Sequence, residues 1–237
     1  MGPEDHHTYR RIVGRLQFLI PRRPDLLFAQ SQLTQALAAP TAQDWQAMKR
    51  AVRYLTGARD HALTHQVKHR REVFIDGFSD ADWAGDRSTR RSMTSWAIFF
   101  DGVLLSAGAR RQNIVAQSSC EAEYIAAVTT AAEMKYLAAL FAECGIEVKL
   151  RLYVDSTAAV GVAQRRGLQR MRHLDVRFLW LQQEVHEKRL AILRVPGNVN
   201  CADAGTKPTD RATHERCREQ LRVLPAASIL CAFVGNQ

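Results

Sequence analysis

The stretch Val73-Phe-Ile-Asp-Gly-Phe-Ser-Asp-Ala-Asp-Trp-Ala-Gly-Asp86 decides how the rest of the chain is interpreted. Its first residues, Val, Phe and Ile, favour a pleated, half-buried strand. Carboxylates follow at Asp76, Asp80 and Asp82, and the alternation of side chains along a strand places them on one face. A carboxylate on a buried strand is costly unless it is paired or binds a metal. The stretch alone is also compatible with a polar strand end that runs into a turn, so carboxylates elsewhere in the chain must decide.

The composition bounds the possible partners. The chain has 237 residues, 46% of them hydrophobic, which is enough for one large domain or one domain with a helical appendage. Lys and Arg number 33 against 24 Asp and Glu, giving a formal net charge of +9. This balance points towards a polyanion, of which nucleic acid is the commonest, although many basic proteins are merely soluble. Several basic residues are paired arginines, which suit bidentate phosphate contacts.

The cysteines and the apolar runs indicate the compartment. Five widely spaced cysteines without a C-x-x-C pair argue against a zinc site or a disulfide framework and for a reducing environment. The N-terminus fits neither a signal peptide nor a myristoylation site. The longest apolar run, Ala226 to Val234, is too short to span a bilayer. We therefore expect a soluble intracellular protein, cytoplasmic or nuclear, with no membrane partner.

Residues 9 to about 66 are expected to be helical. Arg23-Pro24-Asp25 separates two helices, and Thr41-Ala-Gln-Asp44 resembles a capping box that starts a further helix, which Gly57 ends. No cluster of candidate catalytic groups occurs here, so a helical packing module is the simplest interpretation. A phosphate-contacting role stays open for the basic residues on the outer face of the last helix: Lys49, Arg50 and Arg53.

Two strands and a long helix follow the quoted stretch. The strands, Ser95 to Phe100 and Val103 to Ala109, flank Asp101-Gly102, a strong hairpin signal. Ser118-Ser-Cys-Glu121 matches a capping box and begins a helix that Gly145 ends. The three strands therefore open a domain whose next element is a long helix.

The two glutamates at the start of this helix point in different directions. Small and apolar residues recur at helical spacing from Glu123, which therefore faces the sheet, and a carboxylate on this packing face needs a reason. Glu121 lies about 200° from Glu123 around the helix axis, and we expect it to cap the start of the helix.

The last part of the chain supplies two further acids. Leu150 to Val154 is expected to be a buried strand that ends at Asp155, and α/β folds place their chemistry at such strand ends. Asp155 is equally compatible with a helix N-cap. The expected elements after it are an arginine-rich connector from Arg165 to Arg172, a helix from about His173 to Lys188, a strand from Leu190 to Val195, a short helix opened by Asn200-Cys-Ala-Asp203, and a last helix over about Thr209 to Val223.

This order of elements resembles the ribonuclease H fold, an α/β fold with a five-stranded mixed sheet flanked by helices, here preceded by a helical segment. The family's chemistry needs acids in the order Asp, Glu, Asp, Asp, on the first strand, the first helix, the fourth strand and the last helix. The chain carries carboxylates in those places: Asp80, Glu123, Asp155 and Asp203.

The residues of the motifs show a more specific resemblance, to the ribonuclease H end of copia-type LTR retrotransposon Pol polyproteins. The resemblance is carried by Ser79-Asp-Ala-Asp-Trp-Ala-Gly-Asp86, Ser118-Ser-Cys-Glu-Ala-Glu-Tyr124, Tyr153-Val-Asp-Ser156, Arg172-His-Leu-Asp-Val-Arg177 and Ala202-Asp-Ala-Gly-Thr-Lys-Pro208. Tyr9 to Gly14, Arg23 to Asp25 and Trp45 to Gly57 resemble the segment that joins reverse transcriptase to that domain. The Tyr-x-Asp-Asp polymerase motif is absent. We therefore expect a C-terminal piece or a truncated open reading frame without polymerase activity.

The resemblance implies a domain division and an activity. We expect a helical connection segment over residues 1–66, a ribonuclease H-like domain over 72–208, and a C-terminal helix and tail over 209–237. The implied activity is cleavage of the RNA strand of an RNA–DNA hybrid by two Mg²⁺ ions, with Mn²⁺ as a substitute. The four acids would act as catalytic residues and metal ligands, since crowded carboxylates repel one another and divalent cations relieve this.

The partners follow from the same resemblance and from the basic charge. We expect an RNA–DNA hybrid, sensed through its 2′-hydroxyls and phosphates, and the polymerase part of a reverse transcriptase as a further possible partner. The candidate nucleic-acid-binding residues are Arg110, Arg111, Arg165, Arg166, Arg170 and Arg172.

Three departures from the family and two alternatives stay open. The loop Pro196 to Asn200 has no histidine, which suggests slower product release. Cys120 occupies the position where the family usually has Thr. Ala107-Gly-Ala109 replaces the usual Trp, and we expect this to loosen the packing there. The first alternative is a silent domain that only binds nucleic acid, against which the intact set of acids argues. The second, an integrase or transposase core, places its Glu last rather than second.

Overall fold

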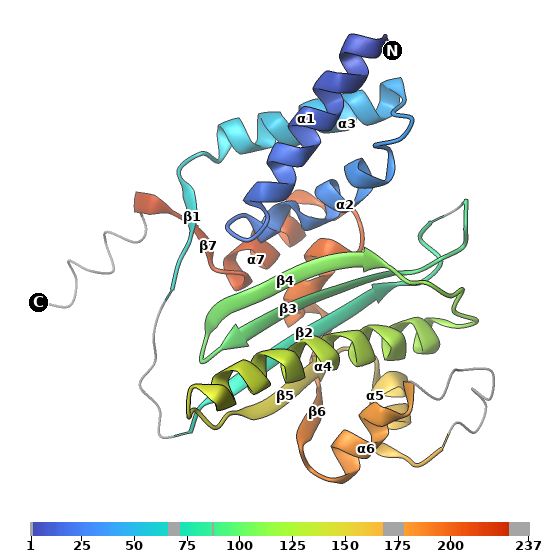
Figure 1. Ribbon diagram of the computed structural model, residues 1–237, viewed down its shortest axis with the longest axis vertical. Coiled ribbons are helices and arrows are strands. Elements are labelled where there is room, and N and C mark those ends of the chain that lie inside the picture. Colours follow the sequence, from blue (N-terminus) through green and yellow to red (C-terminus); the bar gives the residue numbers. More distant parts are fainter. Residues whose placement is uncertain (1, 66–71, 87, 168–177, 228–237) are drawn as a thin grey trace, which may run out of the picture.

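A five-stranded mixed sheet forms the centre of the computed structural model, which describes residues 2–65, 72–86, 88–167 and 178–227. The strand order is β4-β3-β2-β5-β6 (Figure 1). The first three strands form an antiparallel meander, and β5 and β6 run parallel to β2. Their bounds are β2 Phe74–Asp82, β3 Met93–Phe100, β4 Val103–Arg111, β5 Lys149–Val154 and β6 Leu190–Arg194. The predicted α/β fold with a five-stranded mixed sheet is confirmed.

Helix α4 (Ser119–Glu143) covers one face of the sheet and supplies most of the core there. Its Tyr124 and Met134 are fully buried against Ile75 and Leu152 of the strands. At Gly77 an added Cβ would lie 2.3 Å from Met134 Sδ, so glycine is needed for this close approach. Helices α5 (Thr157–Gln164) and α6 (Trp180–His186) continue the layer (Figure 1). By length and composition α4 also resembles a membrane span, but this is the helix packed on the sheet.

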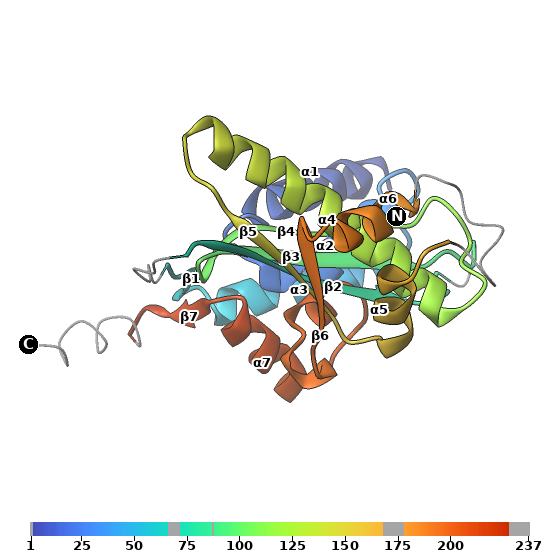
Figure 2. The ribbon, with the colours of Figure 1, turned by 90° about the horizontal axis from the view of Figure 1, so that it is seen from below.

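The opposite face carries the C-terminal elements, as Figure 2 shows with α4 above the sheet and α7 below it. These are the 3₁₀ helices η3 (Gly197–Val199) and η4 (Cys201–Gly205) and the helix α7 (Arg211–Gln220). Cys201 and Cys217 pack there against Phe99 and Leu104 of the sheet. The last helix was expected to extend to about Val223, but α7 ends at Gln220.

The N-terminal helices lie against the β4 edge of the sheet (Figure 1). They are α1 (Pro3–Leu19), η1 (Pro24–Leu26), α2 (Leu27–Gln35) and α3 (Ala42–Gly57). Their own small core contains Tyr9, Leu33 and Met48. A second cluster contains Ile20, Leu26 and Leu27, packed against Ala107 and Ala109 of β4.

The loosened packing expected at Ala107-Gly-Ala109 is not found. The ring of Trp96, on the neighbouring strand β3, lies over Gly108, where an added Cβ would be 2.2 Å from it. The two flanking alanines allow the N-terminal helices to approach. Small residues on β4 thus make room for an indole from one side and for helices from the other.

Two short strands join the segment after α3 to the segment after α7. β1 (His61–Leu63) pairs antiparallel with β7 (Val223–Pro225), and Thr64 N donates to Arg222 O at 2.8 Å. The prediction that the chain is helical to about residue 66 is therefore wrong after Gly57. Of the helix expected over His173 to Lys188, the described part is α6, and residues 173–177 lie outside the described ranges. The division into three domains stays a prediction.

Candidate active site

Three carboxylates converge at one end of the sheet. Asp80 lies in β2, Asp155 follows directly after β5, and Glu123 is in the second turn of α4. Ser79 pairs with Val154 in the parallel ladder, so Asp80 and Asp155 are the next residues on adjacent strands. One oxygen from each carboxylate lies within 4.8 Å of the other two. The sheet register and the start of α4 therefore bring together acids that are far apart in the sequence.

Glu123 is the most strongly perturbed of the three. Burial, followed by the charges of Asp80 and Asp155, raises its pKa from 4.5 to about 9, and a hydrogen bond from the Ala81 backbone only partly offsets this. Its buried Oε2 has no hydrogen-bond partner among the described residues. An unsatisfied carboxylate oxygen that faces other carboxylates is a place where a cation would replace lost solvation.

Asp80 is 2% exposed and sits at the centre of the cluster. Burial and then the charge of Asp203 raise its pKa to about 7, while a short hydrogen bond from Thr206 Oγ1 to its Oδ2 acts in the opposite direction. The hydroxyl fixes one oxygen of the carboxylate and leaves the other for a further ligand.

Asp155 is half-buried and lies against the loop that contains η3. Burial and then Asp203 raise its pKa, whereas Lys207 and the side chain of Asn200 lower it. The Cα of Gly197 faces this carboxylate, since an added Cβ would lie 3.5 Å from Asp155 Oδ2. The N-cap role that the sequence left open for Asp155 belongs to its neighbour Ser156, whose side chain accepts from Ala159 N.

Asp203 lies beside the cluster of Asp80, Glu123 and Asp155. It lies in η4, is 8% exposed, and its Oδ1 is 2.8 Å from the ammonium of Lys207. Its charge acts on both Asp80 and Asp155. The structure thus groups three of the four predicted acids tightly and places the fourth next to them, held by a lysine.

Sequence reasoning gave three polar residues of this region no part in the candidate site, although it expected Asn200 to open the short helix. Asn200, 1% exposed, donates to Ser79 O at 2.9 Å and accepts from Ala202 N at 3.2 Å. The other two are Thr206, bonded to Asp80, and Lys207, paired with Asp203. The spacing of four residues between Asp203 and its lysine is a visible signal for an ion pair, but the contacts of Asn200 and Thr206 depend on the fold.

The neighbouring acids have structural partners. Glu121, 1% exposed, accepts from Gln117 N at 3.0 Å, while its own N–H bonds to Ser118 Oγ at 3.2 Å, in keeping with the predicted capping role. Asp76 forms a bidentate ion pair with Arg151, with distances of 2.6 and 2.7 Å. Burial raises the pKa of Asp82, which lies over Gly85.

The candidate nucleic-acid-binding arginines occupy two places. Arg110 and Arg111 end β4 and line a cavity of about 460 Å³ together with Trp180, and Arg111 pairs with Asp86 at 2.7 Å. Arg165 follows α5, and Arg166 contacts His186. Arg170 and Arg172 lie outside the described residues. A nucleic-acid contact at any of the six stays a prediction.

The donor set suits a hard divalent cation. All the candidate ligands are carboxylate oxygens, which Mg²⁺, Mn²⁺ and Ca²⁺ prefer, and the described residues of the cluster include no sulfur or imidazole ligand. The raised pKa values of Asp80, Glu123 and Asp155 show that the cluster resists carrying its full negative charge without a counterion. These acids fit a metal site.

The strand order of this mixed sheet is that of a ribonuclease H-like fold. The positions of the three acids agree with it: they lie on the first strand of the sheet, near the start of the helix that follows the first three strands, and at the end of the fourth strand in chain order. The chain is 31% identical over 223 residues to the retrovirus-related Pol polyprotein from transposon RE2 of Arabidopsis thaliana, and 34% identical over 214 residues to that from transposon TNT 1-94 of Nicotiana tabacum. Over the part of these retrovirus-related Pol polyproteins that it matches, the chain is their homologue, as the motifs suggested.

The match covers 93% and 89% of this chain but only 15% and 16% of the two relatives. Among solved structures, LC11-RNase H1, isolated from compost by a metagenomic approach, is similar with a TM-score of 0.42 and 14% identity, over 58% of this chain and 94% of that one. No family model matches the chain.

Proposed function

We propose that the chain is a metal-dependent endoribonuclease that cleaves the RNA strand of RNA–DNA hybrids. The convergence of Asp80, Glu123 and Asp155 within 4.8 Å carries this proposal. Such a cluster does not help to stabilise the fold, because it contains carboxylates that raise one another's pKa values. Cations bound to it would relieve this repulsion and allow the acids to be ionised together, which is the condition for catalysis by this class of site.

The metal chemistry would be that of a two-ion site. Two Mg²⁺ ions, for which Mn²⁺ can substitute, lower the pKa of an attacking water and stabilise the leaving 3′ oxygen of a phosphodiester. The residues that would hold them are Asp80, Glu123, Asp155 and Asp203. Thr206 holds one oxygen of Asp80, and Asn200 contacts Asp155.

The residues around the acids restrict how these ligands move. Asn200 links η4 to the backbone of Ser79, the residue before Asp80, so strand and 3₁₀ helix are fixed relative to each other. Lys207 keeps Asp203 near the cluster and supplies one positive charge beside four acids. Positioning of this kind lowers the cost of assembling a site when the substrate arrives.

The substrate part of the proposal rests on charge and on family. A net charge of +9 favours a polyanion. Similarity to retrovirus-related Pol polyproteins makes an RNA–DNA hybrid the substrate that we propose. The loop Pro196 to Asn200 carries no histidine, so we expect slow product release rather than loss of cleavage.

The test is digestion of a labelled RNA–DNA hybrid with and without Mg²⁺, beside single-stranded RNA and duplex DNA. We expect cleavage of the hybrid's RNA strand only, and only with the metal. Asp80→Asn should abolish cleavage and keep the fold, because it removes a ligand and keeps the shape of the side chain. Asp82→Asn is the matched control on the same strand. A fully active Asp80→Asn variant would refute the assignment of the site, and binding without cleavage would favour the silent, nucleic-acid-binding alternative.

A further inference from the structure

A groove runs between the N-terminal helices and the C-terminal part of the chain. One cavity of about 560 Å³ lies between α2 and α3 on one side and Lys207 and Pro208 on the other. A second, of about 620 Å³, lies between the end of α3 and α7. Tyr54, Thr209 and His214 line both cavities, so the two cavities adjoin one another. We call these two adjoining cavities the junction groove.

One end of the junction groove reaches the candidate active site. Lys207 lines the groove, and its ammonium contacts Asp203, whose charge acts on Asp80 and Asp155. A strand of nucleic acid that leaves the acids along this side would therefore enter the groove directly.

The walls of the groove carry more positive than negative charge. Arg50 and Arg53 of α3 line one wall, and Arg211 and Arg218 of α7 line the other. The acids of the lining are already engaged within the chain. Asp44 accepts from Thr41 at the start of α3, Glu215 accepts from Arg211 Nε at 2.8 Å, and Asp25 pairs with Arg23.

Two of these arginines have no local acid. Among the described residues, no carboxylate forms an ion pair with Arg50 or Arg53, both of which are exposed. Since α3 contributes them from the segment that precedes the sheet, their charge extends the basic surface beyond the ribonuclease H-like part. An exposed row of arginines beside a cavity is the composition that binds phosphates.

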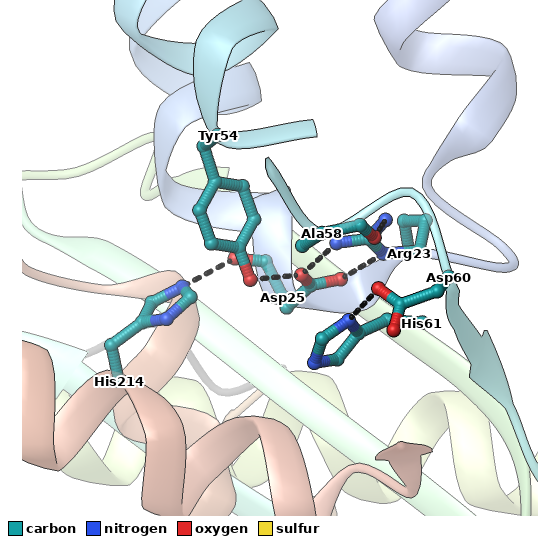
Figure 3. A network of polar contacts seen from close by, with 7 residues as sticks. All are labelled: Arg23, Asp25, Tyr54, Ala58, Asp60, His61 and His214. Carbon is teal, nitrogen blue, oxygen red and sulfur yellow. Dashed lines mark hydrogen bonds and ion pairs between the residues drawn. The ribbon is translucent and has the colours of Figure 1, made fainter. Parts of the chain in front are cut away.

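A network of polar contacts connects the elements at the base of the groove (Figure 3). Tyr54 Oη donates to Asp25 Oδ2 at 2.6 Å, and Arg23 holds the same carboxylate at 3.0 and 2.7 Å. His214 of α7 contacts the backbone carbonyl of Asp25 at 3.1 Å. The carboxylate of Asp25 is fully buried, and these bonds tie α3 and α7 to η1. The two walls therefore keep a fixed spacing.

We propose that the junction groove binds the phosphodiester backbone of one nucleic-acid strand that continues from the active site. The inference rests on the proposed function for its substrate but concerns a different surface, one that the N-terminal helices build. A strand rather than a protein is indicated because exposed arginines line the cavities. Lys207, which lines one cavity, also contacts Asp203 beside the acids, where a phosphodiester must lie for cleavage. The N-terminal helices would then be part of the substrate-binding surface.

The experiment measures binding, not cleavage. The whole chain is titrated, without divalent metal, against a blunt RNA–DNA hybrid and against hybrids with a single-stranded extension at each of the four ends, and fluorescence anisotropy is followed over a range of salt concentrations. We expect one polarity of extension to bind more tightly than the blunt hybrid. The double variant Arg50→Gln with Arg53→Gln should lose this gain. We plot the logarithm of the affinity against the logarithm of the salt concentration for the variant and for the wild type. For contacts to a single strand, the slope for the variant should be shallower by about 0.7 for each phosphate that it no longer neutralises.

Lys49→Gln is the matched control. It removes one positive charge from the same helix, but Lys49 lies over the Trp45 ring at 5.7 Å and does not line the groove. Arg211→Gln tests the opposite wall independently. The proposal is overturned if no extension increases affinity, or if the double variant keeps the gain as Lys49→Gln does. A chain that binds extended hybrids in this way but never cleaves them would contradict the proposed nuclease activity and leave the groove assignment intact.

Discussion

Glu123→Gln should stabilise the metal-free protein at neutral pH. In the folded protein the pKa of Glu123 is raised to about 9, by burial first and by neighbouring acids second. An unfolded chain releases this proton near pH 4.5, so between pH 4.5 and about 9 the folded state holds a proton that the unfolded state has released. Stability therefore falls as pH rises through this window. Glutamine has nearly the same shape and no proton to release.

The magnitude follows from the same two pKa values. Each pH unit between them corresponds to about 1.4 kcal/mol, so at pH 7 the wild type loses up to about 3 kcal/mol through this carboxyl. For a protein of this size, 1 kcal/mol shifts the melting temperature by about 2–4 °C. The variant should melt several degrees higher than the wild type at pH 7 in EDTA, and the difference should vanish towards pH 4.5. Mg²⁺ should raise the melting temperature of the wild type and narrow the gap.

Glu121→Gln is the internal control, because it makes the same substitution two residues earlier on the same helix. Glu121 accepts a hydrogen bond from Gln117 N at the start of α4, where a negative charge is favourable. Its replacement should lower the melting temperature, by the equivalent of about 1 kcal/mol. If Glu123→Gln also lowers it, or if the difference from the wild type is the same at about pH 5 and pH 8, then Glu123 is not an uncompensated acid and the electrostatic argument is wrong.

Three further substitutions test other contacts. Lys207→Met should tighten Mn²⁺ binding about 2- to 5-fold, as measured by calorimetry, because it frees the carboxylate of Asp203 from a half-exposed ion pair. An unchanged affinity for Mn²⁺ would show that the lysine does not compete with the metal. Gly205→Ala should lower stability in urea by about 1–3 kcal/mol, because the added Cβ would lie 2.2 Å from Ser95 Oγ, whereas Gly14→Ala, with open space around it, should not destabilise. Tyr54→Phe should cost about 1–3 kcal/mol by removing a donor from a buried carboxylate, and a neutral result would mean that water replaces the hydroxyl.

The sequence predicted the strands well because they depend on strong local signals. β2 begins with a β-favouring run, and the hairpin turn at Asp101-Gly102 uses residues that accept positive φ, where they adopt φ values of 46° and 88°. Periodicity and turn chemistry were sufficient for these elements. The acids were selected through the resemblance to the ribonuclease H fold, and the structure brings Asp80, Glu123 and Asp155 together.

The features that were not predicted depend on partners distant in sequence. β1 and β7 are three residues each, too short for a recognisable alternation, and they form only because the segments after α3 and after α7 meet. Ala107-Gly-Ala109 suggested loose packing because the sequence does not show that Trp96 and the N-terminal helices fill the space. The ion pair of Asp203 with Lys207 was missed for a different reason: the partner is only four residues away, but the motif was matched by its acid alone.

The short segment from Asn200 to Lys207 connects the candidate active site to the junction groove. Its first residue ties η4 to the strand that carries Asp80, and its last residues hold Asp80 and Asp203. The same η4 also packs on α2 and α7, which themselves line the groove. A cation that draws Asp203 towards the cluster must also release the lysine that pairs with it, and that lysine lines the groove. Metal at the acids and a strand in the groove would therefore act on the same side chain, and each would favour the binding of the other.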